Sequence, residues 1–440
     1  MNFNLPVAIV GAGPAGLVAA RALQKENISF VVYERHSDVG GIWDIKNPGT
    51  PMYESAHFIS SKTLSGFPDF PMPDHYPDYP TRTQIDEYIK NFATHYQLRE
   101  HIKFNTSVEK AVFDEVDKTW QITDNKSITN NYRALVCGNG PLWSPSMPTY
   151  KGTFTGTLRH SSAFKKSTEF LGQKVLVVGA GNSGVDIACE AASYADKASL
   201  SMRRGYYFIP KHLFGIPADV IAHGGPKLPT WLNQFIFTLM HKLIVGNQSK
   251  FGLPKPDHKI LESHPVLNSQ VMHHTSHGNL SIKPDIDYFE GKTVFFKDGT
   301  SDEFDDIILA TGFNYKIPYA EQYFDWTEGR PQLFMSLFAP KTDNLFAIGF
   351  METNSAGYEM FTEMAKMMVD YLKSQEKTPE LAKEFRQKVA NEKLDLSGGI
   401  KFIKTARHTG YVDSDTYRGF LKKFQKRMGW SPYKVGYYVS

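Results

Sequence analysis

Two short segments of the chain carry glycines at a spacing that suits the binding of a diphosphate. The first is Gly11-Ala12-Gly13-Pro14-Ala15-Gly16, and the second is Gly179-Ala180-Gly181-Asn182-Ser183-Gly184. In such a pattern the first glycine permits a tight turn, the second lets the backbone approach a diphosphate, and the third lets a helix pack closely on a strand. Free N–H groups at the start of that helix favour negative charge. The chain therefore has two candidate dinucleotide sites.

The residues that follow the next expected strand have opposite charges at the two sites. Glu34 stands 23 residues after Gly11, where a carboxylate accepts hydrogen bonds from ribose hydroxyls and repels a 2′-phosphate. Arg203 and Arg204 stand 24 and 25 residues after Gly179, and guanidinium groups match the geometry of a phosphate. The first site therefore suits FAD or NAD and the second suits NADPH. A solvated basic loop is the alternative interpretation of the arginine pair.

We assign FAD to the first site and NADPH to the second, because a mobile hydride donor needs a resident flavin to receive the hydride. The expected FAD site includes Gly11, Gly13, Pro14, Ala15, Gly16, Glu34, Arg35 and Val108. The expected NADPH site includes Gly179, Gly181, Asn182, Ser183, Gly184, Arg203 and Arg204.

Short apolar runs predict the strands that must position these residues, and several are continuous, as in parallel sheets covered on both faces. They are Val7–Val10, Phe30–Tyr33, Ala134–Cys137, Val175–Val178, Ala198–Met202, Ile307–Leu309 and Leu345–Ile348. Helices are predicted at Leu17–Lys25 and Val185–Tyr194. The alternation predicts an α/β protein with two Rossmann-like, doubly wound domains. We expect an FAD domain of residues 1–165 and 300–440, with an NADPH domain of residues 166–299 inserted into it.

Bulk properties exclude several other classes of protein. Hydrophobic residues make up 41% of the chain and the formal net charge is only +3, so the overall charge gives no reason to expect nucleic acid or an anionic membrane as partner. The two cysteines, Cys137 and Cys189, are too far apart for the redox pair of a disulfide-reducing flavoenzyme. No metal-ligand cluster or nucleophile motif is present. The oligomeric state stays open, with a homodimer as one alternative.

Two further segments carry weaker signals. Residues 47–82 are rich in prolines and aromatics, which predicts an ordered loop that either covers a cofactor or is merely structural. Residues Trp231 to Val245 form the most apolar stretch, but polar residues interrupt it, so we expect no membrane-spanning helix and a cytoplasmic protein. We expect this stretch to be an amphipathic helix packed on the protein. A peripheral membrane element or a substrate entrance is the alternative.

One longer segment adds a family resemblance. Phe154-Thr155-Gly156-Thr157-Leu158-Arg159-His160-Ser161-Ser162-Ala163-Phe164 fits the signature FxGxxxHxxx(F/Y) of the flavin-containing monooxygenases. The chain resembles that family over nearly its whole length. Further pieces that resemble it are Gly40-Gly41-Ile42-Trp43, Ser60-Ser61-Lys62, Phe67-Pro68-Asp69-Phe70-Pro71, Met202-Arg203-Arg204-Gly205 and Ala310-Thr311-Gly312-Phe313.

The resemblance implies a reaction cycle and further site residues. NADPH reduces FAD, the reduced flavin captures O2 as a C4a-hydroperoxide, and the distal oxygen passes to an amine nitrogen or a sulfide sulfur. By resemblance, Gly41, Ile42, Trp43 and Thr311 join the FAD site. His160 resembles a residue that links the two nucleotide domains, and direct acid–base catalysis is its alternative role.

One departure from the family affects the expected chemistry. An asparagine usually precedes the Ser-Ser-Lys segment and helps to hold the oxygenated flavin, but Ile59 stands there in this chain. Either Ser60, His57 or Asn354 substitutes for it, or the enzyme leaks H2O2. We expect Ile59, Ser60 and His160 to belong to the catalytic region.

The resemblance leaves other functions open. A Baeyer–Villiger oxygenase acting on ketones has a related signature, but the Lys165 that follows Phe164 favours an amine or sulfide substrate over a ketone. An NADPH oxidase that produces only H2O2 is a second alternative, and a nucleotide-binding protein without turnover is a third. The expected partners of the enzyme are O2 and a small-molecule amine, sulfide or ketone.

Overall fold

A five-stranded parallel sheet, in the order β23–β7–β1–β2–β3, organises the first of two units of the chain. The computed structural model describes residues 2–225, 228–405, 408 and 410–432. β1 and β7 are buried at every position, as their continuous apolar sequences require. The strands are β1 (Val7–Val10), β2 (Phe30–Tyr33), β3 (Ile102–Lys103), β7 (Ala134–Cys137) and β23 (Leu345–Ala347).

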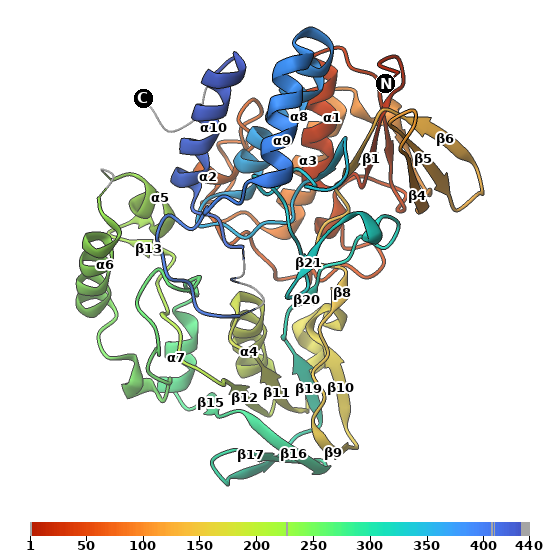
Figure 1. Cartoon of the computed structure of the whole chain (residues 1–440). Coiled ribbons are helices and arrows are strands. Elements are labelled where there is room, and N and C mark those ends of the chain that lie inside the picture. The colour runs from red at the N-terminus through yellow and green to blue at the C-terminus, as the bar shows by residue number, and fades with distance from the viewer. Residues whose placement is uncertain (1, 226–227, 406–407, 409, 433–440) are drawn as a thin grey trace.

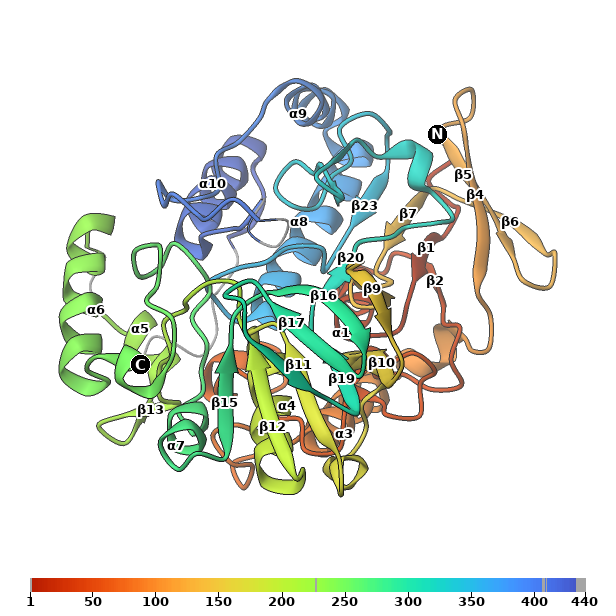
Figure 2. The same ribbon diagram turned by 90° about the horizontal axis from the view of Figure 1, so that it is seen from below.

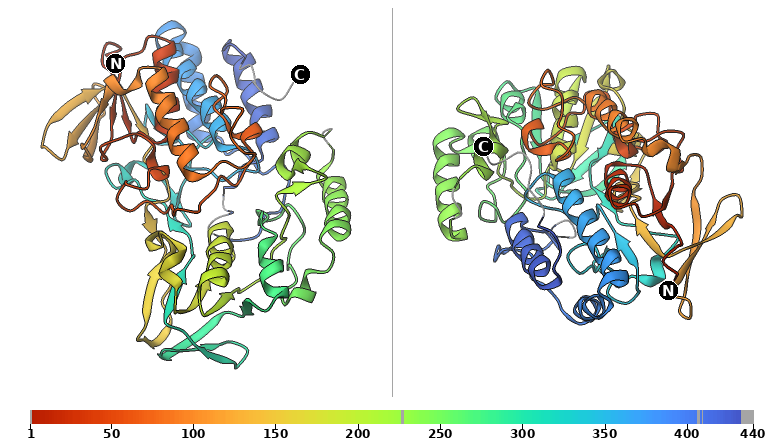
Figure 3. Two further views of the ribbon diagram at one scale, coloured as in Figure 1. Left: turned by 180° about the vertical axis from the view of Figure 1, so that it is seen from behind. Right: turned by 90° about the horizontal axis from the view of Figure 1, so that it is seen from above.

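Helices cover one face of this sheet and a smaller antiparallel sheet covers the other (Figure 1). The chain enters the first helix through Pro14, whose fixed φ suits a helix start. Figure 3 shows these helices from behind and from above. The helices of this unit are α1 (Pro14–Lys25), α3 (Arg82–His95), α8 (Gly357–Lys377), α9 (Pro379–Asn391) and α10 (Ser414–Met428). The smaller sheet contains β4 (Val108–Asp114), β5 (Thr119–Asp124) and β6 (Thr129–Tyr132).

A second five-stranded parallel sheet, in the order β10–β19–β11–β12–β15, organises the other unit (Figure 2). Its helix α4 (Asn182–Tyr194) packs on one face together with α7 (Gln270–Ser276), and an antiparallel sheet covers the other face. The parallel strands are β10 (Thr157–His160), β11 (Lys174–Val178), β12 (Lys197–Ser201), β15 (Leu280–Lys283) and β19 (Asp306–Leu309). The covering sheet contains β9 (Lys151–Phe154), β16 (Ile286–Gly291), β17 (Thr293–Phe296) and β18 (Ser301–Glu303).

The two units are joined by a narrow antiparallel pair, β8 (Ser144–Pro145) and β20 (Phe313–Asn314), which lies between them in Figure 1. β8 leads from the first sheet to the second, and β20 leads back. We call this pair the hinge strands. The two connections between the units run side by side here. A rotation of one unit against the other must therefore bend the backbone at the hinge strands.

The predicted fold class, two Rossmann-like doubly wound units, is confirmed. Every predicted strand is present, and β1, β2 and β7 have the predicted bounds. However, β10 and β19 lie wholly outside the predicted 166–299 insertion and still belong to the second sheet. That sheet therefore extends past the predicted limits at both ends, and the division into two domains stays a prediction.

The connection between β12 and β15 projects from the second unit. It contains the hairpin β13 (His212–Leu213) and β14 (Ile216–Pro217), then α5 (Ala218–His223) and α6 (Thr230–Ile244). The predicted amphipathic helix is therefore present as α6, but none of its residues is buried. It packs on the protein through residues that are half-buried, among them Leu232, Ile236 and His241, which contacts the Tyr207 ring. In the part of the chain that the structure describes, no helix is long and apolar enough to cross a bilayer.

The remaining irregular segments agree with the sequence. Residues 47–82 form a loop that contains the short helix α2 (Lys62–Ser65) and ends where α3 begins. A small pair of strands, β21 (Trp326–Thr327) and β22 (Arg330–Pro331), precedes β23. Cys137 and Cys189 are both buried free thiols, as their apolar neighbours predict.

A buried group of charges joins α8 to α10. Arg418 contacts both Glu359 and Glu363, in each case at 2.8 Å, and the two glutamates are almost fully buried. Burial raises the pKa of Glu363 to about 7, although Arg418 opposes this effect. The interface between these helices therefore contains a carboxyl group that titrates near neutral pH.

Two candidate dinucleotide sites and the segment between them

The first glycine segment forms a cradle that excludes side chains. Gly11 has a φ of +103°, and a Cβ there would lie 2.5 Å from the carbonyl oxygen of Gly138. A Cβ at Gly16 would lie only 1.9 Å from the carbonyl oxygen of Gly11, so α1 packs directly on the turn. Gly13 precedes α1, and no side chain caps that helix. The first N–H groups of α1 are therefore left for an anion.

The Gly41–Trp43 turn closes over this cradle. A Cβ at Gly41 would lie 3.0 Å from the Cα of Gly13, so the two backbones touch. Trp43 is buried, and its ring centroid lies 5.1 Å from that of Phe58, which in turn lies 5.6 Å from that of Tyr358. The structure thus brings Gly41, Ile42 and Trp43 to the first site, where the family resemblance puts them.

Glu34 lies at the end of β2 beside the cradle. Its Oε2 accepts a hydrogen bond from the Ala12 N–H at 2.6 Å, and its Oε1 accepts one from the His36 N–H at 2.8 Å. Burial raises the pKa of Glu34, and these two N–H groups partly offset that effect. The carboxylate is therefore fixed in place as an acceptor next to the glycine turn.

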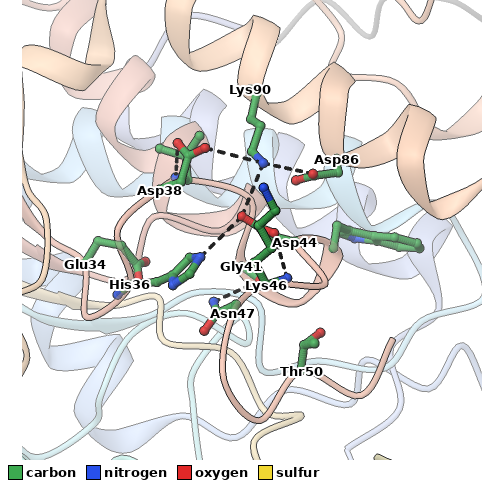
Figure 4. Close-up of polar contacts among 12 residues, drawn as sticks. Glu34, His36, Asp38, Gly41, Asp44, Lys46, Asn47, Thr50, Asp86 and Lys90 are labelled. Atoms are coloured by element: carbon green, nitrogen blue, oxygen red, sulfur yellow. Dashed lines mark hydrogen bonds and ion pairs between the residues drawn. The ribbon is translucent and has the colours of Figure 1, made fainter. Parts of the chain in front are cut away.

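A network of charges holds the loop that follows Glu34 (Figure 4). The Lys90 ammonium lies 2.9 Å from Asp86, 3.2 Å from Asp44 and 3.4 Å from Asp38. Burial alone would raise the pKa of Asp44, but the Lys46 N–H and Lys90 outweigh it and hold that pKa below its usual value. Since Asp44 directly follows the Gly41–Trp43 turn, this network fixes the turn over the cradle.

The other residues predicted for the first site lie around its rim. The guanidinium of Arg35 stacks on the Trp143 ring at 4.2 Å. The Thr106 N–H donates to the Glu34 carbonyl at 2.9 Å, which brings the start of β4 at Val108 near Glu34. Pro14 and Ala15 form the first turn of α1. Pro14 and Ala15, Arg35 and Thr106 thus follow the carboxyl ends of β1, β2 and β3 of the first sheet.

The second glycine segment repeats the geometry of the first. Gly179 has a φ of +105°, and a Cβ there would lie 2.6 Å from the carbonyl oxygen of Ala310. A Cβ at Gly184 would lie 1.9 Å from the carbonyl oxygen of Gly179. Gly181 precedes α4, which has no side-chain cap, and α4 begins with Asn182 and Ser183. The chain therefore has a second uncapped helix start of the same shape.

Arg203 and Arg204 lie just beyond the end of β12, next to this second cradle. The register pairs Ser201 of β12 with Val178, the residue before Gly179. Arg203 is exposed, and Arg204 lies 3.5 Å from Asp257. The Nη1 of Arg204 is buried and, among the described residues, has no hydrogen-bond partner. An anion next to Arg204 would satisfy this nitrogen.

His160 and Thr311 tie the second sheet to the hinge strands. The Nε2–H of His160 donates to the Gly312 carbonyl at 2.9 Å, and its Nδ1 accepts from the Ser162 N–H at 3.1 Å. Thr311 donates to the Ser146 carbonyl at 2.5 Å. Burial lowers the pKa of His160 despite the bond to Gly312. His160 is therefore a neutral ring whose two nitrogens already have partners.

The segment with Ile59 is held from the opposite unit. Ile59 is 40% exposed, and Ser60 accepts a hydrogen bond from the Ser65 hydroxyl at 2.6 Å. The Ser61 N–H donates to Asp219 of α5 at 2.6 Å. The Ser61 Oγ is fully buried without a hydrogen-bond partner in the described part of the chain. This segment therefore presents an unused hydroxyl and depends on the second unit for its position.

Two more contacts join the same parts of the two units. The Tyr79 hydroxyl donates to the Lys211 carbonyl at 2.5 Å, and His212 lies 2.9 Å from Asp78. Together with Asp219, these residues make the segment 211–219 a support for the loop of residues 57–82. By contrast, Asn354 is engaged elsewhere, because it bonds Asp413 and the Ser414 N–H at the start of α10.

Comparison with known proteins agrees with this arrangement. Residues 5–415 match the model of the family described as flavin-binding monooxygenase-like. The chain belongs to this flavin-binding monooxygenase family. It is 30% identical to the probable indole-3-pyruvate monooxygenase YUCCA8 of Arabidopsis thaliana, over 81% of this chain and 86% of that protein. It is 27% identical to human flavin-containing monooxygenase 5, over 93% of this chain and 81% of that protein.

Solved structures of this family share the fold. A steroid monooxygenase bound to NADP superposes with a TM-score of 0.70 at 19% identity, over 98% of this chain and 99% of that one. The family resemblance drawn from the sequence is thus confirmed, and the predicted cofactors, FAD and NADPH, are those of the family. The monooxygenases that it resembles use O2 and small-molecule substrates.

The residues present fit two dinucleotides. Each cradle has an uncapped helix start, and the glycine before that helix, Gly13 or Gly181, has space in which a Cβ would fit. In addition, Nη1 of Arg204 is buried without a partner among the described residues. Sequence reasoning missed Asp219, Lys90 and the unpartnered hydroxyl of Ser61. Only Ser61 had a sequence signal, since it belongs to the Ser-Ser-Lys segment that the monooxygenase shares with its family.

Proposed function

We propose that this monooxygenase takes hydride from NADPH at the second cradle and uses FAD at the first to oxygenate an amine nitrogen or a sulfide sulfur. The observation that carries the proposal is the pair of equivalent cradles with opposite charges beside them. Glu34 at the first suits an unphosphorylated ribose, and Arg203 and Arg204 at the second suit a 2′-phosphate. This difference assigns one nucleotide to each site.

Bound FAD supplies hydride acceptance and O2 activation, and the protein supplies orientation and exclusion of water. Glu34 holds the ribose of FAD through its second lone pairs, since its first contacts are the Ala12 and His36 N–H groups. Trp43, Phe58 and Tyr358 form a continuous aromatic group beside the cradle. This group would exclude water from the side of the cradle that it covers.

His160 positions other parts of the protein and does not act as an acid or a base. Both ring nitrogens are engaged, so the imidazole is not available to exchange a proton with a substrate. Its bond to Gly312 instead fixes the hinge strands relative to the second sheet. His160 would therefore help to fix the position of one cradle relative to the other.

Ser61 takes the place of the missing asparagine. The aliphatic Ile59 cannot donate a hydrogen bond, and the amide of Asn354 already caps α10. The buried Ser61 hydroxyl has a free donor, and the Ser60 hydroxyl keeps its own hydrogen after accepting from Ser65. A buried donor of this kind stabilises developing negative charge more than one in water does.

A second candidate function is an NADPH oxidase that releases H2O2. The exposure of Ile59 supports it, because water reaching this segment would shorten the lifetime of activated oxygen. Oxygenation of a carbonyl compound is a third candidate, since one relative is a probable indole-3-pyruvate monooxygenase. Lys165, which binds the Thr50 carbonyl at 2.6 Å, replaces the residue typical of Baeyer–Villiger enzymes.

A substrate panel tests the proposal. Purified enzyme receives NADPH with a thioether, a tertiary amine, a cyclic ketone or a 2-oxo acid, and NADPH loss, oxygenated product and H2O2 are measured together. We expect product to account for most NADPH with the thioether or amine. Equal amounts of H2O2 and consumed NADPH in every arm would establish the oxidase. Product only from the ketone or the 2-oxo acid would establish carbonyl oxygenation.

A further inference from the structure

The outer helix α6 exposes a row of large apolar side chains. Trp231, Phe235, Leu239 and Leu243 are 69%, 63%, 49% and 77% exposed. They are spaced four residues apart, so they lie along one side of the helix. Ordinary surface helices turn such residues inward, whereas α6 contributes nothing to any of the hydrophobic core clusters of the described residues. This row needs an external partner.

The rest of α6 faces the protein and holds the helix in place. His241 lies edge-on to Tyr207 with ring centroids 5.2 Å apart, and Leu232, Ile236 and Phe237 are half-buried. Figures 1 and 3 show α6 at the outer edge of the second unit, away from both parallel sheets. The exposed row therefore belongs to a supported helix at the rim of the molecule.

The segment of sequence that contains α6 is basic, although the chain as a whole is not. Residues 228–260 contain Lys242, Lys250, Lys255 and Lys259 but only one acidic residue, Asp257, which gives a net charge of +3. The whole chain has the same net charge of +3, so the other residues balance to zero. All four lysines are exposed. An apolar row inside a basic region is complementary to an anionic lipid surface.

We propose that α6 docks this monooxygenase on an anionic lipid bilayer, lying in the plane of the interface with Trp231, Phe235, Leu239 and Leu243 among the headgroups. Its 15 residues span about 22 Å, which is too short to cross the hydrocarbon core. The hairpin between β13 and β14 adds a second exposed apolar tip at Phe214, which is 84% exposed. Peripheral docking needs no membrane-spanning segment.

A second copy of the chain fits this surface less well. A symmetric contact through α6 would put the same patch of each copy face to face. Lys242 and the lysines that follow would then oppose each other, which costs free energy instead of gaining it. A bilayer rich in phosphatidylserine has the opposite charge. It also deforms around separate projections, which a folded partner cannot do without a matching shape.

Co-sedimentation with vesicles tests this docking. The full-length, flavin-loaded enzyme is mixed with vesicles of phosphatidylcholine alone or of phosphatidylcholine with phosphatidylserine, at low and at high salt. We expect binding to the anionic vesicles, weakened by salt, and little binding to the neutral ones. Replacing Phe235 and Leu243 by Ser should weaken binding about tenfold or more, because two large side chains no longer leave water. Flavin absorbance and melting temperature should stay unchanged.

The matched control replaces two other exposed apolar residues, Val116→Ser and Leu171→Ser, which are 90% and 61% exposed and lie away from α6. This variant should bind vesicles like the parent. The proposal is overturned if the parent stays in the supernatant with anionic vesicles, or if the control loses as much binding as the α6 variant. Light scattering supplies a further outcome. A dimeric parent and a monomeric α6 variant, without vesicle binding, would make the row an interface between copies and refute lipid docking.

Discussion

At the scale of single residues, we propose that the charge beside each cradle determines which nucleotide binds there. Charge-assisted hydrogen bonds to a phosphate contribute about 1.5–3 kcal/mol each. We therefore expect Arg203→Ser with Arg204→Ser to raise the KM for NADPH roughly 100-fold or more and to leave that for NADH nearly unchanged. Initial rates with both cofactors provide the measurement. An equal rise for both cofactors would mean that the arginines do not recognise the 2′-phosphate.

Asp219 is the second residue whose replacement is informative. Asp219→Ala leaves the buried Ser61 N–H without its acceptor, so the segment with Ile59 loses its support from the second unit. We expect the share of NADPH that ends as H2O2 to rise roughly twofold or more, with little change in the KM for NADPH.

Simultaneous assays of NADPH and H2O2 make that measurement. Asp287→Ala, on the exposed side of β16, is the matched control and should behave like the parent enzyme. An unchanged H2O2 share in Asp219→Ala would show that this contact does not position the segment.

These residues differ in how visible they are in the sequence. The positions of the glycines, Glu34 and the arginine pair at the ends of strands could be predicted, because strand, turn and helix are consecutive and fix the spacing. The contact between Ser61 and Asp219 could not, since it joins residues 158 positions apart through the stacking of two units. Ile59 was visible as a departure from the family, but its exposure was not.

At the scale of secondary-structure elements, a substitution at a helix start can weaken nucleotide binding without weakening the fold. A Cβ at Gly181 would meet no heavy atom within 4 Å, whereas the third glycine of the segment has no such space. Gly181→Ala should therefore fold with a melting temperature close to that of the parent. The added methyl group occupies the space of the diphosphate, so we expect the affinity for NADP⁺ to fall about tenfold or more.

Calorimetric titration with NADP⁺ tests this expectation, and the flavin content serves as an internal reference that should not change. Gly225→Ala, at an open glycine of the same unit, is the control for the added methyl group. Undiminished NADP⁺ affinity in Gly181→Ala would place the dinucleotide elsewhere.

The strands could be predicted from the sequence where both faces of the strand are buried. β1, β2 and β7 are continuous apolar runs between glycines or turns, so their ends were evident. β10 was missed as a strand because Thr157-Leu158-Arg159-His160 has no such run and lies at the edge of its sheet. Its membership of the second sheet depends on pairing with β19, about 150 residues later.

At the scale of the whole molecule, stability should respond to pH through the contact of α8 with α10. The pKa of Glu363 is about 7 in the folded protein, above its ordinary value of 4.5. A carboxyl group with a raised pKa stabilises the fold fully below its ordinary pKa, and this contribution is lost as the pH rises through 7. The parent should therefore lose roughly 2 kcal/mol of unfolding free energy between pH 5.5 and 8 through this group.

Glu363→Gln removes the titrating group and should flatten that part of the pH profile. Urea unfolding at a series of pH values measures the effect. Glu384→Gln, which alters the surface ion pair with Arg427, is the control and should keep the parent's slope. Identical slopes in parent and Glu363→Gln would mean that Glu363 does not change its protonation between pH 5.5 and 8.

How the two units stack could not be predicted from the sequence. Local patterns predict each sheet, but the angle between the sheets depends on the hinge strands, on His160 and on the support that residues 211–219 give to the loop of residues 57–82. These contacts lie between segments with no recognisable pattern of their own.

The near-identity of the two glycine turns has a practical consequence for redesign. Since both exclude a methyl group at the same spot by the same 1.9 Å approach, neither turn discriminates between nucleotides by shape. On the proposed assignment, a change of coenzyme preference would require edits only at the end of β12, where Arg203 and Arg204 stand, and both glycine turns could stay unchanged. Conversion to an NADH-dependent oxygenase would then call for replacement of these two arginines, with every glycine kept.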